Sequence, residues 1–318
     1  MRATTMKRIT PLLLLCAMST AAAAEETIKL GYPETPSGAV AIVADKAGLW
    51  EKNGLRVESI SFAAAINARD AIIGGRLDVG IAGLSNFLVG SQQGGMVSLG
   101  IAVDQCASAA VMVKPDSPIK SIADLKGKRV ASQTGTITQS AFANRVLKGG
   151  GLAPSDVQMV NLKFQDMISA LTAGSVDAIT AVDPFLSSAE HAKLGAVITD
   201  FCPYSRVPLV YVASDKVAKN PDVVKKLLKT WRETAALFGA EPQKAAQIYS
   251  DTLKARGYEL PPEVVAKMIQ RLSVKKDTVE FTPAFLEFVA EEGAVMQKAG
   301  QLTKAPDVAV DFPKQPLE

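Results

Sequence analysis

A short segment occurs twice in the chain and constrains its fold more than any other feature. Gly75-Arg76-Leu77-Asp78-Val79 in the first half matches Gly174-Ser175-Val176-Asp177-Ala178, which lies 99 positions further on. Each copy is typical of a turn from a helix into a strand. The separation exceeds the periods of about 20–50 residues found in solenoid repeats. It therefore indicates two lobes of similar topology.

The surroundings of the two copies predict the same order of elements. The first half is expected to contain strands at 27–31, 55–62 and 77–82, with helices at 39–47 and 65–74. The second half is expected to contain strands at 129–132, 157–162 and 176–182, with helices at 139–148 and 166–173. This βαβαβ order is typical of parallel sheets covered by helices. The expected fold class is α/β with two lobes, each a mixed, mostly parallel sheet flanked by helices.

Two further apolar runs, 109–113 and 207–214, are expected to carry the chain from one lobe to the other. On this interpretation lobe I is discontinuous and comprises residues 25–115 and 203–318, whereas lobe II comprises residues 116–202. The last part of the chain is expected to be helical. Asn220-Pro221 is a typical helix start, and Pro242, Pro262 and Pro283 each introduce a further amphipathic helix.

Residues 1–24 have the features of a secretory signal peptide. A basic start is followed by a short apolar stretch that includes Leu12–Leu15, and Ala22-Ala23-Ala24 is a typical cleavage site. Cys16 could instead mark a lipoprotein, but the bulky Leu15 before it argues against lipidation. Three positive charges lie in the first eight residues, so removing the segment cancels the formal net charge of +3. The neutral charge of the exported chain removes the argument for nucleic acid or acidic membrane surfaces as partners, since both need a basic face.

Two cysteines remain after the signal peptide, Cys106 and Cys202. They are either buried free thiols or a disulfide. An oxidising compartment and an even count favour the disulfide. Position favours it as well, because each cysteine lies a few residues before one of the two crossing segments.

Ligands of open parallel sheets bind beyond the carboxyl ends of the strands. This rule selects the loops 32–38, 62–65 and 83–87 of lobe I and the loops 133–138, 164–166 and 183–185 of lobe II. Their hydroxyls and amides, together with helix N-termini, suit a carboxylate or sulfonate. Each Ser or Thr could equally be a simple helix cap. The candidate ligand-binding residues from these loops are Tyr32, Thr35, Ser37, Phe62, Ser85, Asn86, Thr134, Thr136, Thr138, Gln165 and Asp183.

No Lys or Arg lies in these six loops. An anion is therefore expected to be held by backbone N–H groups and hydroxyls, or by a nearby arginine (Arg69, Arg145 or Arg206). The alternative for each arginine is a solvated surface charge. Gln105 and Arg206, beside the crossing segments, complete the candidates. Asp183 and Asp104 could accept a hydrogen bond from a ligand amine or serve as structural caps.

Catalytic machinery is not evident in the sequence. His191 is the single histidine, which argues against a histidine-rich metal site and a Ser-His-Asp triad. No phosphate-binding G-x-x-x-x-G-K-[ST] motif occurs. We therefore expect a binding protein without cofactor or metal rather than an enzyme.

Four segments carry a resemblance to a known family: the run 41–55 with Ala47–Leu55, the run 70–80, Val182-Asp183-Pro184-Phe185 and, above all, the segment Asp116–Val130 with its Asp-Leu-Lys-Gly-Lys core. They resemble the periplasmic substrate-binding proteins of ABC importers, of the sulfonate/nitrate/taurine and thiamine-pyrimidine-precursor type. The resemblance covers residues 28–214 and is weak in the C-terminal helices. It implies a type II periplasmic binding protein fold that closes over a solute.

This resemblance also implies a function, partners and contacts. The solute would be a small organic anion, delivered by a monomeric periplasmic protein to the membrane permease of an ABC importer. Contacts carried over by position are Thr35, Ser37, Phe62, Ala63, Ser85, Asn86, the Thr134–Thr138 loop and Asp183. Many members have Trp before Asp-Pro, where this chain has Val182, so one pocket wall differs. The alternatives are a pyrimidine-precursor binding protein and an enzyme like the thiamine-pyrimidine synthases, which is expected to need histidine and a cysteine-rich metal segment.

Overall fold

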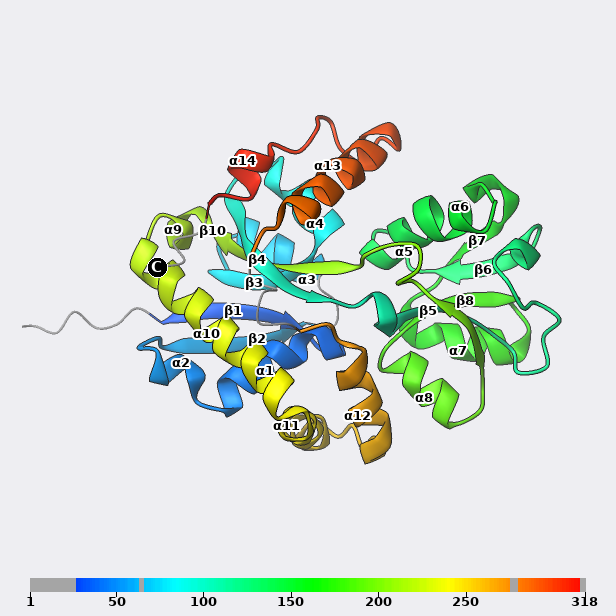
Figure 1. Ribbon diagram of the computed structural model, residues 1–318, viewed down its shortest axis with the longest axis horizontal. Helices are drawn as coiled ribbons and strands as arrows, with labels where there is room; N and C mark the ends of the chain where they lie inside the picture. Colours follow the sequence, from blue (N-terminus) through cyan, green and yellow to red (C-terminus); the bar gives the residue numbers. More distant parts are fainter. Residues whose placement is uncertain (1–26, 63–65, 275–279, 315–318) are drawn as a thin grey trace, which may run out of the picture.

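The computed structural model describes residues 27–62, 66–274 and 280–314, so the expected signal peptide, Cys16 and Ala63 lie outside the described residues. Two sheets lie side by side along the long axis of the molecule, each with its own helices (Figure 1). We call the first sheet with its helices lobe I and the second sheet with its helices lobe II. The expected α/β fold with two lobes is confirmed.

The sheet of lobe I contains four parallel strands and one antiparallel strand. Its order is β2 (Val57–Phe62), β1 (Ile28–Pro33), β3 (Val79–Gly83), β10 (Pro208–Ser214) and β4 (Met96–Asp104). Strand β1 is parallel to β2 and β3, whereas β10 is antiparallel to both of its neighbours.

The sheet of lobe II repeats this plan. Its order is β7 (Gln158–Asn161), β6 (Arg129–Ser132), β8 (Ala178–Val182), β5 (Ala109–Val113) and β9 (Ala196–Asp200). Strand β6 is parallel to β7 and β8, and β5 is antiparallel to β8 and β9. Each sheet is therefore mixed, as expected.

Helices cover both sheets. Those of lobe I are η1 (Pro36–Gly38), α1 (Ala39–Lys46), α2 (Leu49–Lys52), α3 (Ile66–Ile73), α4 (Leu84–Ser91), α9 (Asp215–Ala218), α10 (Pro221–Ala240), α11 (Pro242–Ala255), α12 (Pro262–Arg271), α13 (Pro283–Lys298) and α14 (Val308–Asp311). Those of lobe II are η3 (Ala123–Leu125), α5 (Ile137–Ala141), η4 (Phe142–Val146), α6 (Leu147–Gly149), η5 (Pro154–Asp156), α7 (Phe164–Ala173) and α8 (Phe185–His191). The short η2 (Cys106–Ser108) lies between the lobes.

The repeated segment has the same role in both lobes. Gly75 and Gly174 have φ values of 67° and 76°, a left-handed conformation that glycine adopts at little cost. The carboxylate of Asp78 accepts the backbone N–H of Lys29 at 2.9 Å. Asp177 accepts the backbone N–H of Arg129 in the same way at 2.8 Å. The repeat thus places β3 against β1 and β8 against β6.

The chain crosses between the lobes twice, and each crossing inserts a strand into the opposite sheet. Residues 104–109 lead from β4 into β5, and residues 200–208 lead from β9 into β10. The expected boundary after residue 115 assigns 109–113 to lobe I, but β5 pairs with β8 and β9 and therefore lies in lobe II. Strands β4 and β9, which the sequence analysis did not predict, form sheet edges, β4 beside β10 and β9 beside β5.

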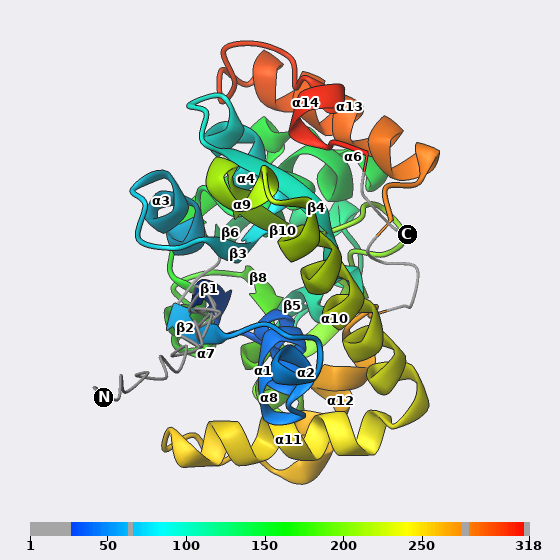
Figure 2. The ribbon, with the colours of Figure 1, turned by 90° about the vertical axis from the view of Figure 1, so that its left-hand side faces the viewer.

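The prolines of the C-terminal region start helices as predicted. Pro221, Pro242, Pro262 and Pro283 are the first residues of α10, α11, α12 and α13. The Asn220 side chain accepts from the N–H of Val223 at 3.2 Å and so caps α10. These helices extend lobe I on two opposite sides. Helices α11 and α12 lie on one side, and α13 and α14 lie on the other (Figures 1 and 2).

An aromatic cluster forms part of the core of lobe I. The rings of Trp50 and Trp231 are 4.5 Å apart, and those of Tyr211 and Trp231 are 4.0 Å apart. Trp50 and Trp231 are 0% and 2% exposed. The cluster joins α2, α10 and the exchanged strand β10, so it fixes β10 within lobe I.

Candidate functional site

The loop that follows β1 is compact and buried. Thr35 and Ser37 lie with their hydroxyls 2.8 Å apart, and Ser37 is 1% exposed. A Cβ at Gly38 would stand 1.9 Å from the carbonyl oxygen of Pro33, so only glycine fits this turn. The Tyr32 hydroxyl accepts a hydrogen bond from Arg256, whose guanidinium lies 5.6 Å from the ring centre.

The other loops of lobe I place Phe62, Ser85 and Asn86. Ser85 and Asn86 lie in the first turn of α4, and each is 6% exposed. The buried Ser85 hydroxyl has no hydrogen-bond partner within the described residues. A buried hydroxyl left in this state costs free energy, so it is a natural contact for a ligand. Phe62, at the end of β2, packs its ring against Gly31, where a Cβ would lie 2.9 Å from Cε2.

The loop between β6 and α5 differs from the expectation in its details. Thr136 caps α5, because its hydroxyl accepts from the N–H of Gln139 at 3.1 Å and donates to the carbonyl of Gln133 at 2.8 Å. Thr138 is buried at 2% exposure. Thr134 and Gln165 are exposed, and Thr134 uses its own N–H to hold Asn161 at 3.0 Å. Thr138 is therefore the enclosed hydroxyl of this loop.

Asp183 is the buried carboxyl of the loop between β8 and α8. One oxygen, Oδ1, accepts from the N–H of Ser187 at 2.8 Å and lies 3.7 Å from Arg271 Nη1. The other, Oδ2, is buried without a hydrogen-bond partner within the described residues. Burial raises the pKa of Asp183, and the bonds from Ser187 and the charge of Arg271 oppose this shift only in part. Asp183 therefore caps α8 through Oδ1, while its Oδ2 lacks a hydrogen bond among the described residues.

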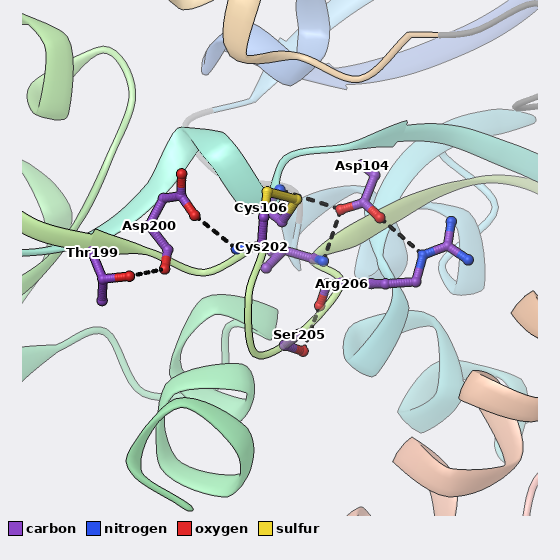
Figure 3. The surroundings of a disulfide bond; sticks show 8 residues. Asp104, Cys106, Thr199, Asp200, Cys202, Ser205 and Arg206 are labelled. Carbon is purple, nitrogen blue, oxygen red and sulfur yellow. Dashed lines mark hydrogen bonds and ion pairs between the residues drawn. A yellow bond between two sulfur atoms is a disulfide. The ribbon is translucent and has the colours of Figure 1, made fainter. Parts of the chain in front are cut away.

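The two crossings are joined by a disulfide between Cys106 and Cys202, with a Cα–Cα distance of 4.8 Å (Figure 3). Both cysteines follow the same local turn. The N–H of Cys106 donates to Asp104 Oδ1 at 3.2 Å, and the N–H of Cys202 donates to Asp200 Oδ1 at 3.0 Å. An Asp-x-Cys turn thus ends β4 and β9 alike, a signal that the sequence contains and that the sequence analysis did not use.

Asp104 also holds Arg206. Its Oδ2 accepts from Arg206 Nε at 3.0 Å, and its Oδ1 accepts from the N–H of Val207 at 2.9 Å. Figure 3 shows Asp104 between the disulfide and Arg206. Gln105 begins η2, where its backbone N–H donates to the carbonyl of Val207 at 3.1 Å. Gln105 and Arg206 therefore take part in the crossing itself.

The candidate loops of the two lobes meet across the lobe boundary. A Cβ at Gly83, at the end of β3, would lie 3.3 Å from Cγ2 of Ile137, the first residue of α5. Elsewhere on the boundary, burial raises the pKa of Tyr249 in α11, Arg256 opposes the rise, and the charge of Asp183 adds to it. Tyr249 donates to the carbonyl of Glu34 at 3.3 Å. Tyr249 thus bonds to the loop after β1 and lies close enough to Asp183, in the loop after β8, for the charge of Asp183 to affect its pKa.

The three candidate arginines are each paired with a carboxylate. Arg69 lies 2.7 Å from Asp70, Arg206 contacts Asp104, and Arg145 lies 3.4 Å from both Glu291 and Glu292. To bind an anion, each arginine would have to give up its carboxylate partner, which costs free energy. For these three arginines, binding an anion would compete with an existing carboxylate partner, whereas neutral hydroxyl and N–H donors carry no such competition.

Comparison with known proteins places the chain in a family. Residues 35–245 match the NMT1/THI5-like family, which is more than half of the chain. The chain belongs to the NMT1/THI5-like family. It is 27% identical over 263 residues to a putative aliphatic sulfonates-binding protein of Escherichia coli, with 80% of each chain covered. It is 23% identical over 311 residues to the taurine-binding periplasmic protein of the same organism, with 94% of each covered.

A solved structure related to this NMT1/THI5-like chain has the same fold. The crystal structure of the periplasmic aliphatic sulphonate binding protein SsuA from Escherichia coli superposes with a TM-score of 0.78 at 24% identity. The match covers 91% of this chain and 93% of SsuA. The periplasmic binding protein fold expected from the sequence is therefore confirmed.

Several polar residues near the candidate loops of this NMT1/THI5-like chain were not predicted from the sequence. Ser108 lies opposite Asp183 at the start of β5, and its buried hydroxyl has no hydrogen-bond partner within the described residues. Arg271, Tyr249 and Arg256 come from the C-terminal helices and their ends, far along the chain from the loops they contact. The Asp104–Cys106 and Asp200–Cys202 turns were the one local signal for part of this arrangement.

Within 27–62, 66–274 and 280–314, no group of three or more His, Cys, Asp or Glu side chains is placed to hold a metal ion. Over the same ranges, none of the helices combines the length and apolar character needed to cross a bilayer. His191 lies 3.7 Å from Glu263 at the surface.

Proposed function

We propose that this protein binds a small organic anion, an aliphatic sulfonate in the first instance, between its two lobes and delivers it to the permease of an ABC importer. The family and the fold support solute binding, and the names of the relatives support the sulfonate. The observation that carries the proposal is the buried hydroxyl of Ser85, in the first turn of α4 at the lobe boundary, which has no hydrogen-bond partner among the described residues.

The chemistry of the boundary suits a sulfonate. Sulfonate oxygens accept several hydrogen bonds from neutral donors, and the hydroxyls of Ser37, Ser85 and Thr138 are buried in loops at the carboxyl ends of strands. The paired arginines leave this neutral set as the main source of donors. We assign Ser37, Ser85, Asn86 and Thr138 to the ligand and Thr136, Gln105 and Arg206 to the scaffold.

The same proposal includes the processing and organisation of the chain. Residues 1–24 act as a signal peptide that is removed on export to the periplasm. Lobe I corresponds to residues 25–104 and 208–318, and lobe II to residues 109–200, because β10 lies in the sheet of lobe I and β5 lies in the sheet of lobe II. The protein works as a monomer whose outer surface meets the permease.

Thermal-shift and calorimetric titrations test the function. Butane-1-sulfonate and taurine are compared with butanoate, which keeps the alkyl chain but presents a carboxylate, and with a hydroxymethyl-aminopyrimidine for the pyrimidine-precursor alternative. We expect a rise in melting temperature with a sulfonate, since a ligand that binds only the folded state stabilises it. Ser85→Ala should weaken binding about tenfold, because one hydrogen bond to a charged group is worth roughly 1.5 kcal/mol or more.

Thr134→Ala is the matched control, since Thr134 is exposed and its hydroxyl makes no bond that the site uses. It should bind like the parent. Binding of the pyrimidine alone, or of no solute among these, contradicts the proposed sulfonate function.

A further inference from the structure

Helices α12 and α13 extend from lobe I on opposite sides of the two crossings (Figures 1 and 2). Side chains of both helices form hydrogen bonds with lobe II. Helix α12 packs on α11 and joins the apolar core beneath β1, whereas α13 packs on α4. Their contacts with lobe II differ in kind, and this difference determines how the lobes can separate.

The contact of α13 with lobe II is buried. Glu292, which is 1% exposed, accepts from Ser140 Oγ at 2.6 Å and from Arg145 Nε at 3.4 Å. The Arg145 guanidinium also lies over the Phe288 ring, 4.7 Å from its centre. Ser140 and Arg145 belong to the helical segment α5–η4 of lobe II. Opening this contact would break the two hydrogen bonds that the buried Glu292 carboxylate accepts from Ser140 and Arg145.

Apolar packing is continuous across the α13 side. One buried cluster contains Phe142, Val146 and Leu147 of lobe II together with Phe285, Phe288 and Val289 of α13 and Leu84 and Phe87 of α4. The second crossing adds to it, since the Phe201 and Phe142 rings stack at 6.4 Å and Arg206 lies 5.3 Å from the Phe285 ring centre. Separation here would bring this core into water, which is strongly unfavourable.

The contact of α12 with lobe II is polar. Arg271 Nη1 donates to Ser187 Oγ at 2.8 Å, and Nη2 donates to Glu190 Oε2 at 2.8 Å. Lys267 lies 3.0 Å from Glu190, and His191 lies 3.7 Å from Glu263. The Lys267 and His191 side chains are both 47% exposed. Water can solvate Lys267 and His191 when their pairs part, and exposed pairs of this kind contribute little to stability. Arg271 and Asp183 are themselves largely buried, at 17% and 0% side-chain exposure, so the two sides differ in their apolar packing and not in the burial of their central ion pairs.

The apolar cores end on either side of this polar contact. The buried residues Val264, Val265, Met268 and Ile269 of α12 belong to the core of lobe I. Leu186 and Ala189 of α8 belong to a separate core made of lobe II residues. Within the described part of the chain, no apolar cluster contains buried residues of both helices.

We propose that the lobes separate on the α12–α8 side while the α13 side stays closed as the pivot, and that Arg271 is the side chain that holds the releasable side shut. Arg271 reaches Asp183, Ser187 and Glu190 of lobe II at once and is 17% exposed. Opening in this direction uncovers the loops after β1 and β8. The contact between Gly83 and Ile137 stays closed and forms the inner end of the site.

The test uses two matched arginines and does not depend on which ligand the protein binds. Arg271→Gln removes the charge on the α12 side, and Arg145→Gln removes it on the α13 side, where Arg145 is 19% exposed. Spin labels are placed at Ala192→Cys and Ala266→Cys across α8 and α12, and at Lys148→Cys and Glu287→Cys across α6 and α13. All four positions are exposed, the disulfide stays intact, and Cys16 is replaced by serine.

Double electron–electron resonance on the ligand-free protein measures the distance distribution between the two spin labels of each pair. In Arg271→Gln we expect the Ala192–Ala266 distance distribution to lengthen and broaden while the Lys148–Glu287 distribution stays as in the parent. Arg145→Gln should not lengthen the Ala192–Ala266 distances. If Arg271→Gln does not fold, Lys267→Gln replaces it with the same expectation at smaller amplitude. A Lys148–Glu287 distance that increases as much as the Ala192–Ala266 distance, or no change in either pair, would overturn the proposal.

Discussion

Asp183 Oδ1 lies 3.7 Å from Arg271 Nη1, and the two residues belong to different lobes. The arginine stands close enough to lower the pKa of the carboxyl, yet burial has the larger effect and raises it. The unpartnered Oδ2 is consistent with this balance. Asp183 therefore costs stability when it is ionised, although it caps α8 through Ser187.

Asp183→Asn tests this cost. The folded state holds the proton of Asp183 more tightly than the unfolded state, so the stability that Asp183 contributes is lost as the pH rises through its raised pKa. Asparagine still accepts from Ser187 and does not ionise. Relative to the parent, the melting temperature of Asp183→Asn should therefore improve steadily from about pH 4 towards neutral pH. Thermal unfolding at a series of pH values measures the difference.

Asp177→Asn is the control with the opposite sign. The bonds from Arg129 lower the pKa of Asp177, so its stabilising effect is present above the ordinary pKa and is lost as the pH falls. The deficit of Asp177→Asn should be largest at neutral pH and shrink in acid. Difference curves that slope the same way for both variants would contradict the assignment of Asp183.

Loss of the Cys106–Cys202 bond should destabilise the protein strongly. The bond closes a loop with a sequence separation of 96 residues. In the chain-entropy treatment, a loop of this size stabilises the folded state by roughly 4–5 kcal/mol. Urea unfolding with and without a phosphine reductant gives the free-energy difference. The Cys106→Ala/Cys202→Ala protein should resemble the reduced parent and ignore the reductant; equal stability of the oxidised and reduced parent would refute the expectation.

Two glycines should respond oppositely to alanine. At Gly38 the new Cβ would meet the Pro33 carbonyl oxygen at 1.9 Å, so the turn before α1 must move, at a cost of about 1–3 kcal/mol or more. At Gly239, within α10, a Cβ meets no atom of the described residues within 4 Å apart from its chain neighbours and the backbone of its own helix. Gly239→Ala should stabilise the protein by about 0.5–1 kcal/mol through helix propensity. Chemical denaturation of both variants checks the pair, and a destabilised Gly239→Ala would show that the propensity argument fails here.

The tryptophans should report on lobe I and not on ligand binding. Trp50 and Trp231 are both buried in the aromatic core of lobe I, away from the crossings. We expect blue-shifted emission, weak quenching by acrylamide and little change when butane-1-sulfonate is added. Fluorescence titration beside calorimetry tests this. A large ligand-induced change in emission would mean that binding alters the core of lobe I.

Local signals accounted for much of the fold. The repeated Gly-x-apolar-Asp segment predicted two similar sheets because glycine and aspartate each have a specific backbone role in that turn. Proline and its capping residue marked the start of α10 for similar reasons. No local signal showed into which sheet β5 and β10 would insert. The pairing of β5 with β8 and of β10 with β3 joins residues far apart in sequence, so 109–113 was assigned to the opposite lobe.

The candidate site divides in the same way. Sequence reasoning found the loops, because the carboxyl ends of parallel strands follow from the topology. It could not tell the enclosed hydroxyl of Thr138 from the capping hydroxyl of Thr136, since both residues occupy the same helix start. Arg271 and Tyr249 were missed because their contacts depend on how the C-terminal helices pack. That packing is set by tertiary structure and not by local pattern.

The position of β10 inside the sheet of lobe I makes that sheet depend on a strand that follows the whole of lobe II in the chain. Strand β4 reaches its sheet only through β10, and β9 reaches its sheet only through β5. A fragment ending at Asp104 would leave one flank of β3 unpaired, with open hydrogen-bonding groups prone to aggregation. During synthesis the strands of lobe II are all present once Asp200 has emerged, whereas the sheet of lobe I is complete only after β10 has emerged.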